Sequence, residues 1–289
     1  IGNYLATTLS RGDVFFFSGA DLGEDTVYDL SDDADVHLQG NRNGDFFGYS
    51  LAAADLTSDG YVEVLSAAAG EDHEGADRAG CVYMVSKPTI AESSGLTRAV
   101  SSVSSFKICG VENHVRLGRN TAPQLFDVNG DGTADIVLSA PGAEFGGKAD
   151  EGAVYVFFNE GDFDGVRTVA AADVTLTSGD ADYFGNAMHH GDFDGDGVAE
   201  LAVGAPGADS YDDTVEHSGQ VYVYRSSLLE LGGIVPAEDA SLTISGVGLS
   251  GFGSTIRSAD LDDNGVEDLM VSAHRWSEDH GRVSIFALN

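Results

Sequence analysis

The chain has 289 residues, of which 42% are hydrophobic, and its formal charge is −34, from 48 acidic and 14 basic residues. This apolar content is enough for a folded core and excludes a disordered acidic tail. A surface so rich in carboxylates repels phosphate groups, which excludes nucleic-acid binding, and it suits divalent cations.

The apolar stretches are short. Val154–Phe158, for example, is far below the roughly 20 residues of a membrane-spanning helix, so we expect no membrane insertion. The chain begins at Ile1 rather than Met, and we expect a processed or trimmed product. Cys81 and Cys109 fall in strands expected to be neighbours, so a disulfide and a pair of buried thiols are both open interpretations.

Short β-strands are predicted along the whole chain, because runs rich in Val, Tyr, Phe and Ile alternate with Gly, Asp and Asn. The first forty residues predict three strands, at Tyr4–Thr8, Gly12–Phe17 and Val36–Gln39. No segment holds a helical period long enough to predict a helix. The sequence therefore indicates an all-β fold.

From residue 42 onward one pattern of segments returns four times. Each copy opens with an aromatic or Leu residue followed by Gly, then an acidic loop, an apolar strand, a turn of small residues and a strand that begins with Gly. A last short strand completes the first three copies. The opening pairs are Phe47-Gly48, Leu117-Gly118, Phe184-Gly185 and Phe252-Gly253, and the Gly-led strands are Gly80–Val85, Gly152–Phe157, Gly219–Tyr224 and Gly281–Phe286.

The acidic loop of each copy is nine residues long, with oxygen-bearing side chains at positions 1, 3, 5 and 9 around a Gly at position 6. Such a set is typical of Ca²⁺ sites, and the backbone carbonyl of position 7 is a further ligand. The predicted ligands, in loop order, are Asp55, Thr57, Asp59, Tyr61 and Glu63; Asp127, Asn129, Asp131, Thr133 and Asp135; Asp192, Asp194, Asp196, Val198 and Glu200; and Asp260, Asp262, Asn264, Val266 and Asp268.

Two alternatives to a Ca²⁺ site of this kind are an EF-hand and an acidic turn without metal. An EF-hand needs a Glu at position 12, but Ser66, Leu138, Val203 and Val271 stand there, each inside a predicted strand. An acidic turn without metal is disfavoured by four copies in register. Thr57 is a weaker ligand than a carboxylate, so we expect three to four Ca²⁺ ions, with the first loop the weakest site.

Phe-Gly, the acidic loop, Ala-Pro-Gly and Gly-x-Val-Tyr-Val-Phe together resemble the FG-GAP repeat, the blade unit of integrin α-subunit propellers and their microbial relatives. The resemblance covers nearly the whole chain. It implies a β-propeller of four-stranded antiparallel blades. It also implies that the calcium loops lie on one face and partner-binding loops on the other.

The predicted organisation is one propeller domain over residues 1–289. It has a partial blade at 1–41, blades at 42–111, 112–179 and 180–247, and a partial blade at 248–289. We expect about five blades, with an arc of a larger seven-bladed propeller as the alternative. Strand addition to another copy through open edges is a third interpretation.

No catalytic constellation stands out, so we expect a protein that is not an enzyme. We expect a secreted or cell-surface calcium-binding module that binds a protein or glycan through its exposed loops. The alternatives are a structural subunit joined through its terminal blades and the accessory propeller of a secreted enzyme. The candidate ligand-binding residues are Phe145, Tyr211, His274, Arg275 and Trp276.

Overall fold

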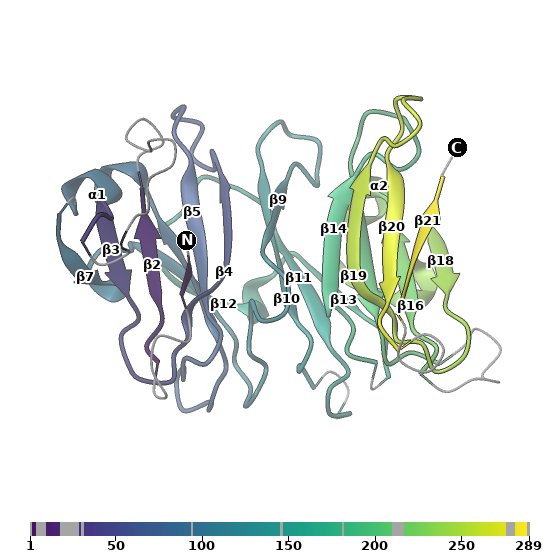
Figure 1. Ribbon diagram of the computed structural model, residues 1–289, viewed down its shortest axis with the longest axis horizontal. Coiled ribbons are helices and arrows are strands. Elements are labelled where there is room, and N and C mark those ends of the chain that lie inside the picture. Colours follow the sequence, from purple (N-terminus) through teal and green to yellow (C-terminus); the bar gives the residue numbers. More distant parts are fainter. Residues whose placement is uncertain are drawn as a thin grey trace. The chain divides into compact units, whose positions relative to one another are not determined.

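The computed structural model describes residues 2–3, 10–17, 29, 32–93, 95–144, 147–180, 182–209, 217–275 and 281–287. The chain divides into two compact units. The first holds residues 1–119 and 161–170, and the second holds residues 120–160 and 171–289. Figure 1 shows both units built from strands joined by loops.

The first unit contains two sheets. One has the order β1–β2–β3–β7, and the other has the order β12–β8–β6–β5–β4. The strands of the first sheet are β1 (Gly2–Asn3), β2 (Asp13–Phe16), β3 (Val36–Gln39) and β7 (Thr97–Ala99). Those of the second are β4 (Phe47–Ala54), β5 (Glu63–Ala68), β6 (Cys81–Val85), β8 (Phe106–Cys109) and β12 (Gly165–Thr168).

The second unit contains three sheets, with the orders β17–β13–β11–β10–β9, β14–β15–β16–β18 and β19–β20–β21. The first comprises β9 (Gln124–Phe126), β10 (Asp135–Ala140), β11 (Ala153–Phe157), β13 (Val174–Thr177) and β17 (Gly233–Pro236). The others comprise β14 (Ala187–Gly191), β15 (Glu200–Ala205), β16 (Gln220–Tyr224) and β18 (Leu242–Ser245), then β19 (Phe252–Ala259), β20 (Asp268–Ala273) and β21 (Arg282–Phe286).

The central strands are buried on both faces, which is why their sequences are continuous apolar runs rather than alternating ones. In β15, Leu201 and Val203 belong to the core shared with the β9–β13 sheet, while Ala202 belongs to the core shared with β19 and β20. Successive residues of a strand point to opposite faces. Each sheet of the second unit is therefore packed against its neighbour, as the blades of a propeller are.

Three short strands join the outer edge of the preceding sheet in parallel. β7 pairs with β3, β12 with β8, and β17 with β13. Each is followed by a 3₁₀ turn, at Val100–Ser102, Val169–Ala171 and Ala237–Asp239. The sequence pattern does not predict these strands. Two short helices, α1 (Lys87–Glu92) and α2 (Ser226–Leu229), precede β7 and β17.

The all-β, propeller-type fold class is confirmed. The antiparallel order of first to fourth strands within each complete sheet is the predicted one, and the parallel outer strands are an addition to it. The strand expected at Tyr4–Thr8 lies outside the described residues. Blade boundaries and the closure of the propeller stay predictions.

Candidate metal centres

Each acidic loop connects the first and second strands of a sheet, so its two ends are fixed by strand pairing. The carboxylate at position 1 folds over the loop and accepts a hydrogen bond from the backbone N–H of the Gly at position 6. The four bonds are Gly60 to Asp55 (2.9 Å), Gly132 to Asp127 (2.8 Å), Gly197 to Asp192 (2.9 Å) and Gly265 to Asp260 (2.8 Å). The sequence repeat is thus also a repeat of geometry.

The carboxylate at position 9 is the first residue of the second strand, and it is buried in all four loops. Exposed fractions are 1% for Glu63, 0% for Asp135, and 3% for both Glu200 and Asp268. Each accepts a hydrogen bond from the backbone N–H of position 2: Leu56 (3.0 Å), Val128 (2.8 Å), Phe193 (2.8 Å) and Leu261 (3.0 Å). Position 9 therefore points back into its own loop.

The side chains at positions 3 and 5 are the remaining predicted ligands, and they lie in the same loop. The residue at position 5 accepts a hydrogen bond from the N–H of position 7, as from Val198 to Asp196 (2.8 Å) and from Val266 to Asn264 (2.7 Å). In the third loop, oxygens of Asp192, Asp194 and Glu200 all lie within 4.8 Å of one another. In the fourth loop the same holds for Asp260, Asp262 and Asp268. Only these two loops have an Asp at position 3.

Burial raises the pKa of the position-9 carboxylate in the second and third loops. Burial, together with the charges of Asp194, Asp196 and Asp192, raises the pKa of Glu200 to about 7, although the hydrogen bond from Phe193 opposes the shift. Burial also raises the pKa of Asp135. At the exposed position 5 of the second loop, hydrogen bonds from Thr133 lower the pKa of Asp131.

These residues fit a hard divalent cation. A buried carboxylate needs a positive partner, and within the described parts of the chain none of the four position-9 carboxylates forms an ion pair with Lys, Arg or His. The nearby oxygens come from carboxylates, Asn or Thr, which are ligands that Ca²⁺ accepts. The residues of positions 1, 3, 5 and 9 would hold the ion, and its charge would offset their repulsion.

The loop backbone explains the residue types between the ligands. Position 6 has φ between +85° and +88° in all four loops, a region that Gly enters without a steric penalty. Position 4 is also left-handed, and it is Gly130 and Gly195 in the second and third loops. In the first and fourth loops Ser58 (φ +55°) and Asp263 (φ +61°) occupy it. Ser58 is the less suitable of the two, because Asp tolerates this region better.

Three residues beside the loops were missed by the sequence analysis, and all follow a third strand. The guanidinium of Arg225 lies 2.9 Å from Oδ2 of Asp194. The backbone N–H of Asn159 donates to Oδ1 of Asp135 at 2.8 Å. The ammonium of Lys87 lies 3.3 Å from the ring centroid of Tyr61. Their common place in the repeat is the only sequence signal that could have identified them.

Of the candidate ligand-binding residues, the structure describes His274 and Arg275. Both are exposed in the turn after β20, at the end of that strand opposite the fourth acidic loop. Nδ1 of His274 lies 2.6 Å from Oγ of Ser254, and the N–H of Arg275 donates to the carbonyl of Ser250. Phe145, Tyr211 and Trp276 lie outside the described residues. The binding role of all five stays a prediction.

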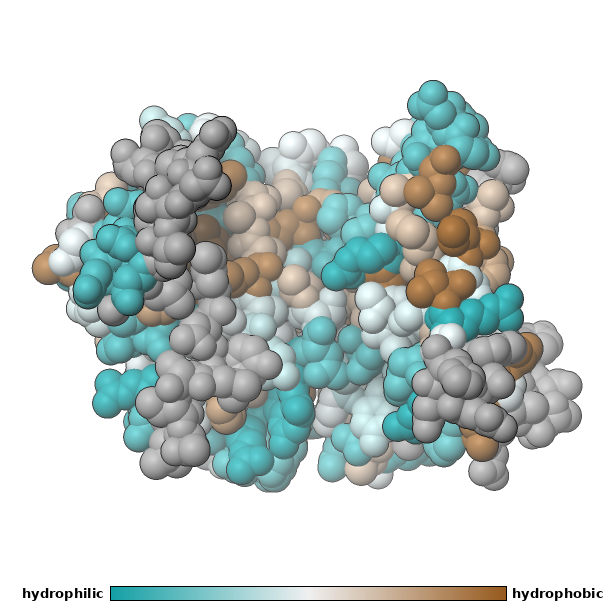
Figure 2. Space-filling model, in the orientation of Figure 1, coloured by the Kyte–Doolittle hydropathy of each residue, from teal (hydrophilic) through white to brown (hydrophobic). Residues whose placement is uncertain are grey.

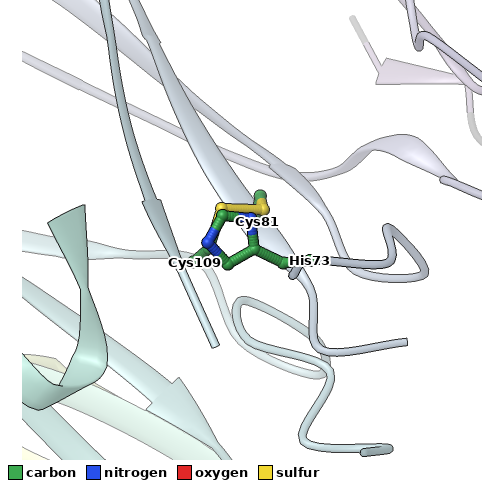
Figure 3. A group of neighbouring side chains, drawn as sticks. All are labelled: His73, Cys81 and Cys109. Atoms are coloured by element: carbon green, nitrogen blue, oxygen red, sulfur yellow. A yellow bond between two sulfur atoms is a disulfide. The ribbon is translucent and has the colours of Figure 1, made fainter. Parts of the chain in front are cut away.

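Cys81 and Cys109 form a disulfide between the paired strands β6 and β8, which decides between the two interpretations of the cysteines. Figure 3 shows the imidazole of His73 beside the sulfur atoms, and one ligand atom of each of the three residues lies within 4.8 Å of the others. Since the sulfurs are bonded to each other, neither is a thiolate that could bind a metal. This group is a packing contact.

Comparison with known proteins bears on the repeat directly. The family model described as "FG-GAP repeat" matches residues 47–83, 121–157 and 184–224, which include the first three acidic loops. These three segments of the chain are FG-GAP repeats. The resemblance of the chain to integrin-like propellers is thereby confirmed, and the described strands of each matched segment are the first, second and third strands of one sheet.

The FG-GAP chain is similar to proteins of two kinds. It is 26% identical over 270 residues to the phosphatidylinositol-glycan-specific phospholipase D of Dictyostelium discoideum, covering 87% of this chain and 28% of that protein. It is 29% identical over 245 residues to integrin alpha-5 of Xenopus laevis (82% and 21%) and 31% identical over 241 residues to integrin alpha-8 of Gallus gallus (79% and 20%). The FG-GAP chain therefore spans less than a third of these relatives.

Both kinds of relative leave the question of enzyme activity open. Most of the named relatives are integrin α subunits, and one kind is a phospholipase. None of the helices in the described part of the chain has the length and hydropathy that a membrane span requires.

Proposed function

We propose that this chain is an extracellular, calcium-binding β-propeller module that binds a protein or glycan through exposed loops. The observation that carries the proposal is the buried carboxylate at position 9, repeated four times and ion-paired with no Lys, Arg or His among the described residues. The similarity of the chain to integrin α subunits over most of its length supports an adhesion or ligand-binding role.

Calcium in this proposal has a structural role. The acidic loop joins the first two strands of each sheet, and the bound ion would hold that hairpin together against carboxylate repulsion. The binding face is proposed at the other end of the strands, where the turns after the second strand differ between repeats. His274 and Arg275 belong to this end, which lies about 17 Å from the fourth loop for a six-residue strand.

An isotherm of Ca²⁺ binding by the purified protein tests the metal part of the proposal. Three to four ions per chain are expected, and a protein that binds none contradicts it. Protein and glycan arrays probed with the calcium-loaded protein test the second part. Binding that is weakened by replacing His274 and Arg275 together with Ala supports it, whereas a variant that binds as tightly as the wild type removes these residues from the binding face.

Two other functions have an observation in their favour. The accessory propeller of a secreted enzyme is supported by the match to the phospholipase D, and a hydrolase panel on the isolated chain tests for activity within it. A structural subunit joined through open terminal sheets is supported by the exposed apolar side chains of β21. Light scattering on the calcium-loaded protein tests this: a monomer at all concentrations contradicts self-assembly.

A further inference from the structure

The third and fourth acidic loops, in adjacent sheets of the second unit, contact each other directly. The backbone N–H of Glu267, at position 8 of the fourth loop, donates to the carbonyl of Asp192, at position 1 of the third loop, over 3.0 Å. Figure 1 draws the β14–β15 and β19–β20 hairpin loops at the same end of this unit, and Figure 2 shows hydrophilic side chains at the tip of the β19–β20 loop. A backbone hydrogen bond therefore joins two candidate metal centres.

Two side chains of the fourth loop extend this contact. Val266 packs against the turn of the third loop, because a Cβ atom on Gly195 would lie 2.8 Å from Cγ2 of Val266. The carboxylate of Glu267 packs against Gly191, where it would clash with any Cβ atom, and it accepts a hydrogen bond from Oγ of Ser258. Glycine at these two positions of the chain thus leaves space that residues of the fourth loop fill.

The corresponding contact is absent between the second and third loops. The residue at position 8 of the third loop is Ala199, and within the described part of the chain its N–H makes no hydrogen bond to the carbonyl of Asp127. A Cβ atom on Gly130, at position 4 of the second loop, would meet no atom within 4 Å. Val198, at position 7 of the third loop, is 42% exposed. The repeat alone therefore does not bring neighbouring loops into contact.

The contacting residues are next to predicted ligands in both loops. Glu267 lies between Val266, whose backbone carbonyl is a predicted ligand, and Asp268, which is the position-9 ligand. The carbonyl that it binds belongs to Asp192, whose carboxylate is a predicted ligand of the third loop. An ion in the fourth loop would fix the backbone from Val266 to Asp268, and that backbone holds Asp192. Ordering one loop thus lowers the conformational entropy that the other loop loses when it binds its ion.

Electrostatic effects between the two sites act in the opposite direction, because a cation in one loop weakens the negative potential that attracts a cation to the other. The predicted ligands include four carboxylates in the third loop and three in the fourth, so each loop stays negative after binding one Ca²⁺. Salt also screens this effect, with a Debye length of about 8 Å at about 0.15 M ionic strength. The hydrogen bond and the packing of Val266 are direct contacts, and we expect them to decide the sign of the coupling.

We propose that the third and fourth loops bind Ca²⁺ as a coupled pair, in which an ion in either loop increases the affinity of the other. The second loop binds its ion independently of the third. The coupling passes through the hydrogen bond from Glu267 to Asp192 and through the packing of Val266 on Gly195. This inference rests on the proposed calcium function and adds its regulation, since a coupled pair fills over a narrower range of Ca²⁺ concentration than two separate sites. Coupling is reciprocal, so the two affinities change by the same factor.

Amide NMR signals can report each loop separately. The N–H of the glycine at position 6 donates to the position-1 carboxylate, so its signal should shift when an ion binds that carboxylate. Ca²⁺ is titrated into the isotope-labelled full chain at about 0.15 M ionic strength, and the signals of Gly132, Gly197 and Gly265 are followed. The titration begins at the lowest Ca²⁺ concentration at which the amide signals of the buried strands are those of the folded chain.

Val266→Ala is the test variant, because it removes the packing on Gly195 and keeps both the charge of the loop and the backbone carbonyl. It should raise the Ca²⁺ midpoints of the Gly197 and Gly265 signals severalfold, by the same factor, and make both transitions less steep.

Two controls accompany this variant. The Gly132 signal, which reports the second loop, should keep its midpoint in Val266→Ala. Val166→Ala makes the same truncation at a residue that is 54% exposed on β12, outside the acidic loops, and it should leave all three signals as in the wild type.

In the wild type, the Gly197 and Gly265 signals should shift together with a Hill coefficient above about 1 and at most about 2, the number of coupled sites. Separate transitions without cooperativity overturn the coupling, as does wild-type steepness in Val266→Ala. Both of these results leave calcium binding itself intact. Glycine signals that do not respond to Ca²⁺ overturn the calcium proposal, and the coupling with it, so the two failures are distinguishable. If Val266→Ala does not fold, the steepness of the wild-type transitions alone decides.

Discussion

The carboxylate of Glu200 accepts a 2.8 Å hydrogen bond from the backbone N–H of Phe193, seven residues earlier in the chain. This bond closes the third acidic loop from its buried end, and the same bond closes the other three loops. It places one negative charge beneath each loop, where only a cation or a proton can neutralise it.

Replacing Glu200 with Gln should have opposite effects with and without calcium. The substitution keeps an acceptor for the Phe193 N–H, because Gln has an amide oxygen. It removes a buried charge that lies close to Asp192, Asp194 and Asp196. In chelator, the variant should melt at or above the wild-type temperature because repulsion is relieved. In Ca²⁺ it should melt below the wild type because a ligand is lost. Differential scanning calorimetry of the variant and the wild type in both buffers measures these opposite changes in melting temperature.

Glu230 is the matched control, since it is exposed and belongs to no acidic loop. Glu230→Gln should leave both melting temperatures unchanged. If Glu200→Gln has the melting temperature of the wild type both in Ca²⁺ and in chelator, position 9 is not a ligand.

Replacing Arg225 with Gln should tighten calcium binding at the third loop severalfold. The guanidinium lies 2.9 Å from Oδ2 of Asp194, a predicted ligand, so it must release that oxygen when an ion binds. The pair is substantially exposed, which keeps its contribution small and sensitive to salt. Titration calorimetry at low ionic strength measures the change.

Arg167→Gln is the control for this comparison, because Arg167 pairs with Asp162, outside the acidic loops. Weaker calcium binding by Arg225→Gln than by Arg167→Gln would mean that Arg225 stabilises the calcium-binding form of the loop. It would contradict a competition between the guanidinium and Ca²⁺ for Asp194.

Ser58→Gly should stabilise the first loop by about 1 kcal/mol, because Ser58 has φ +55° and a side chain there is strained. The reciprocal change, Gly195→Ser at the same position of the third loop, should destabilise. At Gly195 φ is +76°, and a Cβ would lie 2.8 Å from the Val266 side chain. Urea unfolding in Ca²⁺ measures both, and a loss of stability in Ser58→Gly contradicts this account of the first loop.

Asp45→Asn should stabilise the protein at about pH 8 and not at about pH 3. Burial raises the pKa of Asp45 from 3.8 to about 6, and it is 4% exposed. Its folded pKa exceeds its unfolded pKa, so the folded state binds the extra proton between these values. Stability from this group is present below about pH 4 and is lost as the pH rises through about 6.

The gain in Asp45→Asn at high pH should reach up to about 3 kcal/mol, since each unit of pKa shift corresponds to about 1.4 kcal/mol. Asn keeps an oxygen that can accept the hydrogen bond from the Arg42 N–H. Urea unfolding from about pH 4 to pH 8 measures the difference, and parallel stability curves for wild type and variant would show that Asp45 ionises normally. Asp182, two residues before Phe184, has a pKa also raised to about 6 by burial and should behave alike.

The strands and acidic loops could be predicted from sequence because their signals are local. Alternating or continuous apolar runs such as Val154–Phe157 report burial, and Gly at position 6 of each loop reports a left-handed turn. The sequence leaves open whether the two cysteines form a disulfide or are buried thiols. The answer depends on the strand register that places Cys81 opposite Cys109.

The parallel strands could not be predicted, because each joins the sheet of the preceding repeat and its partner is distant in the sequence. Gly165–Thr168 and Gly233–Pro236 are short and largely exposed, and Pro236 is a residue that argues against a strand. Their pairing with β8 and β13 is set by tertiary structure. The contact of Arg225 with Asp194 was missed for the same reason, since nothing in the sequence around Arg225 indicates where its side chain points.

The central claim is that a cation bound by each acidic loop holds together the first two strands of its own sheet. Thermal unfolding of the wild-type chain in Ca²⁺, in Mg²⁺ at equal ionic strength and in excess chelator tests it most directly. We predict the highest melting temperature in Ca²⁺ and the lowest in chelator, with a midpoint that rises with Ca²⁺ concentration. Coincident unfolding curves in Ca²⁺ and in chelator would contradict the claim.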